Sequence, residues 1–363
     1  MARRVIGLTG SIGTGKSHVL ETLVSLGADG VDADRVSREV MQPGGPAFEP
    51  VLAAFGRELL TPAGEIDRSR LGRRVFADPA ALARLERIVH PAVHDAIKER
   101  LAASCAPVFV IEAIKLLEAG LSRTLCDVVW VTQCSRREQF ARLKKGRGMS
   151  EAAVRQRLAN QMQPAEMVRR ADLVIDTGGT YAETDLVVLA AWVDLGAPLP
   201  APVIRGWTLA DAEGIAGVLN AVVREGGRTV TGRTFTPAQE RAFLRTMPKR
   251  SLLNIALLGG VVAGFQEVLP YAAFTHTMDH VGSAGTFILK AVRGRGLGRA
   301  LSAATWAAAR ALGYSKLVIA VRDDNPEAQA FYTGLGFQPC GRLTRQAFVD
   351  GKYVDELLYE LFL

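Results

Sequence analysis

Cysteine is scarce in this sequence, and its few copies lie far apart. The cysteines are Cys105, Cys126, Cys134 and Cys340, and none of them forms a C-x-x-C pair. Zinc knuckles and disulfide frameworks both need cysteines at short, regular spacings, so neither is expected here. We predict free thiols in a protein of a reducing compartment.

A long uninterrupted hydrophobic run is also missing. The most apolar stretch, residues 252–265, contains Asn254 and the pair Gly259-Gly260, and it is too short to cross a bilayer. A β-hairpin fits this pattern better. Residues 1–4 lead directly into an apolar segment, which leaves no space for a signal peptide. We therefore expect a cytoplasmic protein without a membrane partner.

Charge of neither sign dominates the chain. The 44 Lys and Arg residues exceed the 37 Asp and Glu residues by seven, and they occur singly or in short pairs without interleaved aromatic residues. This is a weak footprint for nucleic acid, and phosphate-bearing small molecules explain the excess equally well. No nucleic-acid partner is expected, and the composition does not indicate an oligomeric state.

The length of the chain predicts two domains. With 363 residues, of which 48% are apolar, it is long for a single core. The segment 196–202 has three prolines in seven residues and cannot continue a helix, so we expect it to be the linker. Residues 1–195 would form the first domain and residues 203–363 the second.

The order of elements differs between these two parts. In the first domain, apolar strands alternate with helical segments, which predicts an α/β fold with a parallel sheet. The expected strands span residues 4–9, 107–112, 127–132 and 172–176. The second domain reads as α+β. Its expected helices span 209–224, 237–246, 297–312 and 326–334, and its strands 252–258, 261–269, 284–292 and 316–321, before terminal strands.

The most informative motif lies at residues 10–17, which read G-S-I-G-T-G-K-S and match the pattern G-x-x-x-x-G-K-[ST]. A strand-like segment precedes it and a helix-like segment follows, which is the order that a phosphate loop needs. Its glycines let backbone N–H groups surround an anion, which the N-terminus of the following helix also favours. The alternative is a glycine-rich turn before an ordinary helix.

Residue types assign roles within this loop. Lys16 is expected to reach the β- and γ-phosphates of ATP, and Ser17 to bind Mg²⁺. The predicted ATP contacts in the loop are Ser11, Ile12, Gly13, Thr14, Gly15, Lys16 and Ser17. The motif predicts the donor of a phosphate but not its acceptor.

Two acidic residues, Asp32 and Asp34, follow a short strand-like segment behind the loop. The carboxyl edge of a parallel sheet is where doubly wound folds bind ligands. A carboxylate there can accept the proton of an acceptor hydroxyl or orient Mg²⁺. The alternative is that both residues only cap the next helix.

With this acidic pair, the sequence resembles the dephospho-CoA kinases, a family in which D-A-D follows the phosphate-loop helix at the same distance. The resemblance covers residues 4–192. It rests on Asp32-Ala33-Asp34, His90-Pro91 after a helix, Gln139-x-x-Arg142-Leu143, Arg157-x-x-x-Gln161 and Ala171-Asp172-x-x-Ile175-Asp176. It implies a P-loop kinase with a doubly wound parallel sheet and a helical lid.

The resemblance also implies a reaction, the transfer of the γ-phosphate of ATP to the ribose 3′-hydroxyl of dephospho-CoA, which gives CoA. Asp34 would be the base, Lys16 would act on the phosphates, and Arg142 would lie on the lid above them. The residues that would bind the substrate are Asp32, Asp34, His90 and Glu112.

Other interpretations of these residues stay open. His90 could be packed for structure, and Arg142 could be a solvated helix residue. Thr177 stands where the family has an asparagine, and Glu112 begins a segment in which the proline of the family pattern is replaced. The competing enzyme is another small-molecule P-loop kinase, acting on a nucleoside or on shikimate.

A second anion-binding loop precedes the expected helix 297–312. This loop, with the helix N-terminus, would bind a diphosphate through backbone N–H groups. It comprises Arg293, Gly294, Arg295, Gly296, Leu297 and Gly298. Together with the segment N-P-E-A-Q-A-F-Y-T-G-L-G-F at 325–337, it resembles the acetyl-CoA signature of the GNAT acetyltransferases.

That resemblance implies an α+β fold of the GNAT type and acetyl transfer from acetyl-CoA to an amine that the sequence does not identify. Tyr332 would protonate the departing thiolate, and Asn325 would hold the cofactor or cap the helix. Tyr332 could instead be a packed core residue. The candidates for a base are Glu267, His276, Asp279 and His280.

Three hypotheses remain for the second domain. It could be an acetyltransferase, which we favour because the loop and Tyr332 are intact. It could be a sensor whose occupancy by acetyl-CoA alters the kinase rate. It could also be a structural or interaction module that has kept the fold and lost the site.

Overall fold

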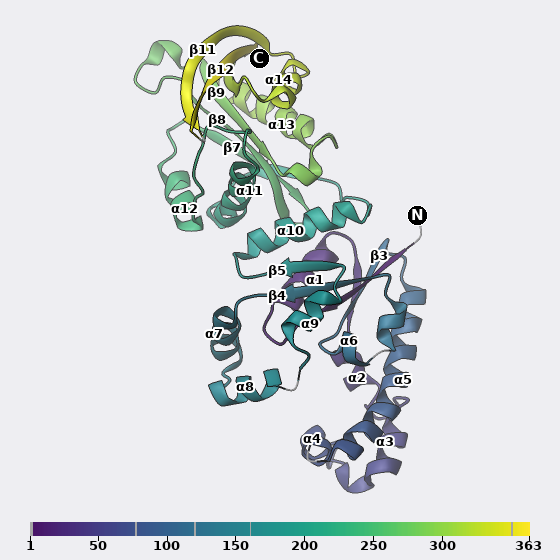
Figure 1. The fold of residues 1–363 in the computed structure, drawn as a ribbon. Coiled ribbons are helices and arrows are strands. Elements are labelled where there is room, and N and C mark those ends of the chain that lie inside the picture. The colour runs from purple at the N-terminus through teal and green to yellow at the C-terminus, as the bar shows by residue number, and fades with distance from the viewer. Residues whose placement is uncertain (1–2, 77, 120, 160, 350) are drawn as a thin grey trace. The chain divides into compact units, whose positions relative to one another are not determined.

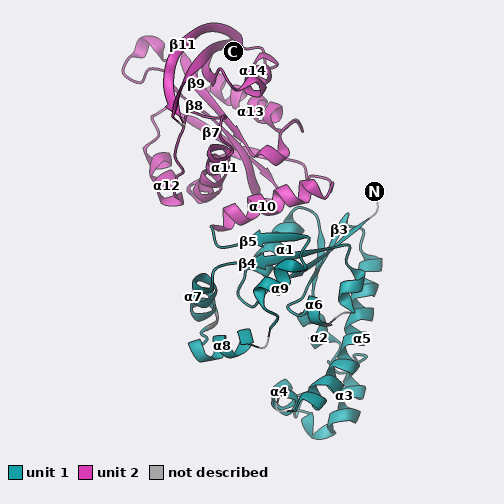
Figure 2. Cartoon of the chain, viewed as in Figure 1, with its two compact units in different colours: residues 1–179 teal, residues 180–363 magenta. Residues whose placement is uncertain are grey.

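The structure is a computed structural model that describes residues 3–76, 78–119, 121–159, 161–349 and 351–363. The chain divides into two compact units, residues 1–179 and residues 180–363 (Figure 2). Helix α10, Tyr181–Asp194, groups with the second unit, although the sequence analysis placed it in the first domain. The linker at 196–202 stays a prediction.

The first unit is built on a parallel sheet that has five strands among the described residues, in the order β2-β3-β1-β4-β5 (Figure 1). The strands are β1 Arg4–Thr9, β2 Asp29–Asp32, β3 Val108–Glu112, β4 Val128–Gln133 and β5 Leu173–Asp176. Residues 5–9 of the central strand β1 are all buried, as expected for a strand covered on both faces. The predicted α/β class and strand positions are confirmed.

Helices connect and cover these strands. They are α1 Lys16–Ser25, α2 Ala33–Glu39, α3 Phe48–Phe55, α4 Arg68–Phe76, α5 Pro79–Ala103, α6 Leu116–Ala119, α7 Arg136–Arg147, α8 Glu151–Ala159 and α9 Pro164–Arg169, with 3₁₀ turns η1 Arg57–Leu59 and η2 Ser122–Leu125. Helix α7 begins with a capping box between Ser135 and Glu138 and ends at Gly148 in the left-handed conformation. Local sequence signals therefore define both of its ends.

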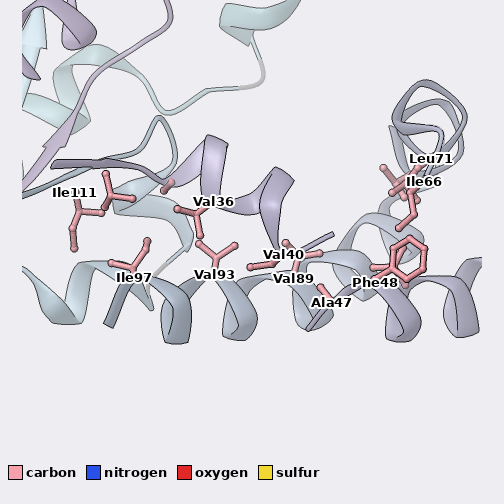
Figure 3. Packing of buried hydrophobic residues seen from close by; sticks show 14 of the residues in the cluster. Val36, Val40, Ala47, Phe48, Ile66, Leu71, Val89, Val93, Ile97 and Ile111 are labelled. Carbon is pink, nitrogen blue, oxygen red and sulfur yellow. The ribbon is translucent and has the colours of Figure 1, made fainter. Parts of the chain in front are cut away.

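The expectation that His90-Pro91 follows a helix is wrong, because both residues lie inside α5. Asp78 caps this helix and Pro79 occupies its first turn, so it begins early and continues for 25 residues. Val89 and Val93, which flank Pro91 in the sequence, are buried against Val36 of α2 and against Val40, the residue that ends this helix (Figure 3). Tertiary packing thus outweighs the helix-breaking tendency of Pro91.

The second unit contains a mixed sheet with seven strands among the described residues, in the order β11-β12-β10-β9-β8-β7-β6. The strands are β6 Val203–Gly206, β7 Leu252–Leu258, β8 Val261–Pro270, β9 Val281–Ile288, β10 Lys316–Arg322, β11 Gln338–Val349 and β12 Lys352–Phe362. Strands β7 and β8 form the predicted hairpin around Gly259-Gly260. The expected strand at 284–292 is shifted, since β9 ends at Ile288 and residues 290–292 form a 3₁₀ turn.

The second unit also contains helices and 3₁₀ turns. They are α10, α11 Ala212–Glu225, α12 Pro237–Thr246, α13 Leu297–Ala311 and α14 Pro326–Thr333, with 3₁₀ turns η3 Leu209–Asp211, η4 His276–Met278 and η5 Lys290–Val292. Of these, α10, α11 and α13 pack on this sheet. Phe337 is fully buried, and its ring makes edge contacts with Trp306 and Tyr332. The predicted α+β class is confirmed.

Across the part of the chain that the structure describes, no helix is both long enough and apolar enough to span a bilayer.

Candidate active sites

The phosphate loop connects β1 to α1, as its motif predicts. Gly13 and Gly15 have φ angles of 80° and 82°, which an L-amino acid rarely adopts. Gly10 is also required, because a Cβ atom there would lie 2.5 Å from Thr132 Oγ1 and 2.6 Å from the Thr132 carbonyl oxygen. The loop is thus held against β4 by contacts that only glycine permits.

Polar side chains hold the loop from several elements. Thr14 Oγ1 lies 2.7 Å from Thr132 Oγ1. Gln139 Nε2 of α7 donates to the Ile12 carbonyl at 2.7 Å, and the Ile12 N–H donates to Gln161 Oε1 at 3.0 Å. Both glutamines belong to motifs that carry the family resemblance, and the structure assigns them to the backbone of the loop.

The side chain of Lys16 is buried and lies along the loop. Its Nζ donates to the carbonyl oxygens of Gly10 at 3.0 Å and Ser11 at 3.3 Å. Ser17 follows it in an exposed position at the N-terminus of α1. These positions leave the ammonium and the hydroxyl beside the backbone cradle, which suits the phosphates of a nucleotide and its Mg²⁺.

Arg142 reaches the nucleotide loop through Thr177. Its guanidinium donates to Thr177 Oγ1 at 3.2 Å and to the Thr177 carbonyl at 2.5 Å. Thr177 Oγ1 in turn donates to the Thr14 carbonyl at 2.8 Å. Thr177 thus links Arg142 to the phosphate loop by hydrogen bonds to both. Thr177 is buried and stands where the family pattern has asparagine.

The acidic residues gather at the carboxyl ends of β2 and β3. Asp32 and Glu112 are register partners in these neighbouring parallel strands. Asp32 accepts hydrogen bonds from the N–H groups of Asp34 and Arg35, so it caps α2. The capping alternative thus applies to Asp32, the N-cap residue of α2, whereas Asp34 lies in the first turn of this helix.

Asp34 lies in a field of mixed charges. Burial, and then the neighbouring Asp32 carboxylate, raise the pKa of its carboxyl above the usual range. The cations of Lys16, Arg38 and Arg68 act in the opposite direction. Asp34 is therefore close enough to the phosphate-loop lysine to share its field. Sequence reasoning missed Arg38 and Arg68, because no local motif marks them.

The other predicted substrate residue of this unit, His90, is half-buried on α5. Its role in binding the substrate stays a prediction.

A cleft of about 940 Å³ opens in the second unit where β9 and β10 separate. Among the described residues, these parallel strands pair only through Val281, Gly282 and Ser283 of β9. Beyond that point residues 284–288 line one wall and residues 320–322 the other. Most of the predicted loop, including Gly294, Gly296 and Gly298, borders the cleft at the start of α13. A split sheet thus supplies a cavity beside a helix N-terminus.

The side chain of Arg293, the first residue of this loop, forms an ion pair and a hydrogen bond within the protein. Both ends of the Arg293 guanidinium bind Glu225, at 2.7 and 2.8 Å, and its Nε donates to the Ile288 carbonyl at 2.9 Å. Glu225 also pairs with Arg228 at 2.8 Å. The Arg293 side chain therefore anchors the loop to α11, and binding of the cofactor by Arg293 stays a prediction.

Tyr332 is buried at the cleft and has a defined hydrogen-bond partner. Its hydroxyl donates to Thr286 Oγ1 at 2.9 Å, and Gln266 Nε2 donates to the same oxygen at 2.7 Å. Burial raises the pKa of the Tyr332 phenol to about 12. The phenol therefore keeps its proton at neutral pH, as a proton donor must. Asn325 caps α14 by accepting the Ala328 N–H at 3.2 Å.

The structure separates the four candidate bases of this unit. Glu267 is the register partner of cleft residue Gly285, and burial followed by the Glu240 carboxylate raises the pKa of Glu267 to about 7. His276 and Asp279 lie on the exposed β8–β9 loop, where they pair with each other at 3.4 Å. His280 ends this loop and is also exposed. Of the four, Glu267 lies nearest to the cleft wall and has a pKa suited to accepting a proton near neutral pH.

No group of three or more His, Cys, Asp or Glu side chains that could hold a metal ion occurs within the described residues. Mg²⁺ bound through nucleotide phosphates and one hydroxyl needs no such group.

Comparisons with known proteins find matches to both halves of the chain. The family model of dephospho-CoA kinase matches residues 4–183, and that of the GNAT acetyltransferases matches residues 224–337. A solved acetyltransferase of the GNAT family from Streptococcus pneumoniae is 25% identical, with a TM-score of 0.42 over 45% of this chain and 100% of that one.

Curated relatives match the first half of the chain. The dephospho-CoA kinase of Geobacter metallireducens is 45% identical over 191 residues, which are 52% of this chain and 94% of the relative. That of Leifsonia xyli subsp. xyli is 43% identical over 195 residues, or 53% of this chain and 98% of the relative. The second half of the chain matches the GNAT acetyltransferase model over residues 224–337, and through its first half the chain belongs to the dephospho-CoA kinase family.

Proposed function

We propose that the first unit transfers the γ-phosphate of ATP to the ribose 3′-hydroxyl of dephospho-CoA. The observation that carries this proposal is the position of Asp34, whose carboxylate lies in the field of the phosphate-loop residue Lys16. A base beside the phosphates is what in-line attack by a hydroxyl requires. The curated relatives, each named dephospho-CoA kinase, support the choice of acceptor.

Each residue of this site has a separate task. Lys16 and the loop N–H groups bind the phosphates, and Asp34 accepts the proton as the hydroxyl oxygen bonds to phosphorus and ADP departs. Mg²⁺, bound with ATP through Ser17, would neutralise charge on the transferred group. Arg142, held by Thr177 beside the loop, can add a second positive charge there.

The test uses purified full-length chain with ATP, Mg²⁺ and dephospho-CoA, and measures the CoA that is formed. Lys16→Ala and Asp34→Asn should each lower kcat by at least about 100-fold, because general-base and phosphate contacts act mainly in the transition state. The matched changes Lys98→Ala and Asp95→Asn, at exposed positions of α5, should leave it unchanged. Phosphorylation of a nucleoside or of shikimate in place of dephospho-CoA would contradict the proposal.

For the second unit we infer acetyl transfer from acetyl-CoA to an amine. The supporting observation is the buried Tyr332 hydroxyl at the wall of the cleft. Glu267 would accept the proton of the attacking amine, and Tyr332 would give one to the departing thiolate. The amine nitrogen bonds to the acetyl carbon, the C–S bond breaks, and CoA leaves.

An amine panel with acetyl-CoA tests this second activity. Tyr332→Phe should lower transfer to an accepted amine by about 100-fold and keep the affinity for acetyl-CoA, because Thr286 still has Gln266 as a partner. If the chain binds acetyl-CoA, acetylates no amine, and changes its kinase rate on binding, the sensor hypothesis replaces this one. If it binds no acetyl-CoA, the structural-module hypothesis does.

A further inference from the structure

The cleft of the second unit is lined by five cationic side chains that differ in what holds them. They are Arg228, Lys290, Arg293, Arg299 and Arg322. An anionic cofactor is attracted by positive charge that the protein itself has not already neutralised. The hydrogen bonds and ion pairs of these five residues therefore indicate which of them can act on a ligand.

Three of the five are neutralised by carboxylates. Arg293 and Arg228 share Glu225, and Arg228 also pairs with Glu327 at 2.8 Å. The buried guanidinium of Arg322 binds both oxygens of Asp324 at 2.9 Å and donates to the Thr229 carbonyl at 3.1 Å. These arginines build the walls of the cleft, because their donors are committed to the protein.

Lys290 and Arg299 differ from these three. Among the described residues, neither side chain has an ion pair or a hydrogen bond to a protein group, and both are exposed. Lys290 lies in η5, just before the anion-binding loop, and Arg299 lies in the first turn of α13, just after it. The two cationic side chains therefore flank the loop 293–298, whose backbone N–H groups can also bind an anion.

The cofactor carries two separate anions for these two sets of donors. Its diphosphate suits the loop N–H groups and the N-terminus of α13. The ribose 3′-phosphate is a monoester that carries about −1.5 to −2 charge at neutral pH, and such a group needs cationic partners. It is also the group that the proposed kinase reaction adds.

We propose that Lys290 and Arg299 bind the ribose 3′-phosphate, so that the second unit selects the 3′-phosphorylated cofactor over its dephospho precursor. This inference rests on the acyl-CoA site proposed above and extends it to specificity. The second unit would then discriminate between the product and the substrate of the first unit by the one phosphate that distinguishes them.

The experiment compares acetyl-CoA with acetyl-dephospho-CoA on the full chain, without ATP. Dephospho-CoA is also the proposed substrate of the first unit, so binding must be read locally. Hydrogen exchange of peptides that cover residues 284–299, followed during a titration, reports on this cleft alone. The wild type should bind acetyl-CoA at least about tenfold more tightly, as expected for a charge-assisted contact to one phosphate.

The double variant Lys290→Met with Arg299→Met should bind both ligands with nearly equal affinity, close to that of the wild type for acetyl-dephospho-CoA. Arg310→Met removes one positive charge from an exposed position of α13, about 16 Å farther along the helix than Arg299, and should keep the preference. Unchanged kinase activity and far-UV circular dichroism check that each variant is folded.

The possible results are distinct. If the wild type binds both ligands equally, or if the double variant weakens both by the same factor, the 3′-phosphate is not what these residues bind and the inference is overturned. If neither ligand protects these peptides, the proposed acyl-CoA site itself fails. A preference that disappears only in the double variant supports the inference.

Discussion

Asp34 combines a proposed proton-accepting role with a pKa that its surroundings raise. Because only the deprotonated carboxylate accepts a proton, kinase activity should fall as pH is lowered through this raised pKa.

Arg68 lowers the pKa of Asp34, so Arg68→Met should raise this pKa further and move the acidic limb of kcat to higher pH. Arg73→Met, on the same helix but bonded to Ser69, is the control. If the acidic limb of the kcat profile stays at the same pH in Arg68→Met, Arg68 does not lower the pKa of Asp34.

Glu267 provides a residue-scale prediction that needs no acetyl acceptor. Its pKa is raised from 4.5 to about 7 in the folded chain, so folding favours its protonated form. This contribution to stability is fully present below pH 4.5 and is lost as pH rises through 7. Between pH 5 and pH 8, the unfolding free energy of the wild type should therefore fall by about 2–3 kcal/mol relative to Glu267→Gln. Denaturant unfolding measures the difference, and parallel pH curves for the two proteins would refute it.

At the scale of the element, the phosphate loop depends on Gly10. The added Cβ atom of Gly10→Ala would meet a backbone oxygen at 2.6 Å, and that oxygen cannot move without displacing β4. We expect a loss of about 1–3 kcal/mol of stability together with a loss of most kinase activity. Gly64→Ala is the matched control, because Gly64 has φ of 79° with open space around it. It should lower stability by about 1–2 kcal/mol and leave kinase kcat and KM unchanged. Equal activity of both variants would show that the loop tolerates the displacement.

At the scale of the whole molecule, α10 belongs to the second compact unit. The Ala182 N–H donates to Glu213 Oε1 at 3.2 Å, and Glu183 pairs with Arg224 at 2.8 Å. Both partners are on α11. A fragment of residues 180–363 should therefore melt at least about 5 °C higher than one of residues 203–363, which lacks α10. Thermal melts followed by circular dichroism test this, and equal melting temperatures would place α10 outside the cooperative unit.

Most features that the sequence predicts correctly are local, because they depend on residues that are consecutive in the chain. Residues 10–17 and the loop 293–298 are continuous segments. Each lies between a strand and a helix, and glycines at fixed positions in the sequence determine the conformation of each loop. The same applies to Tyr332 on the short helix α14 and to Asn325, which caps this helix. The two fold classes follow from the order of apolar segments in the same way.

The tertiary structure decided everything that depends on residues far apart in the chain. Packing of α2 on α5 carried the helix through Pro91, which local propensity predicted to end it. The approach of Arg68 to Asp34 joins separate helices. The pairing of Glu225 with Arg293 commits that arginine to the protein and leaves Lys290 and Arg299 for a ligand. The sequence alone determined which chemical groups are present, whereas only folding could determine which of them are neutralised, because neutralisation depends on distances in space.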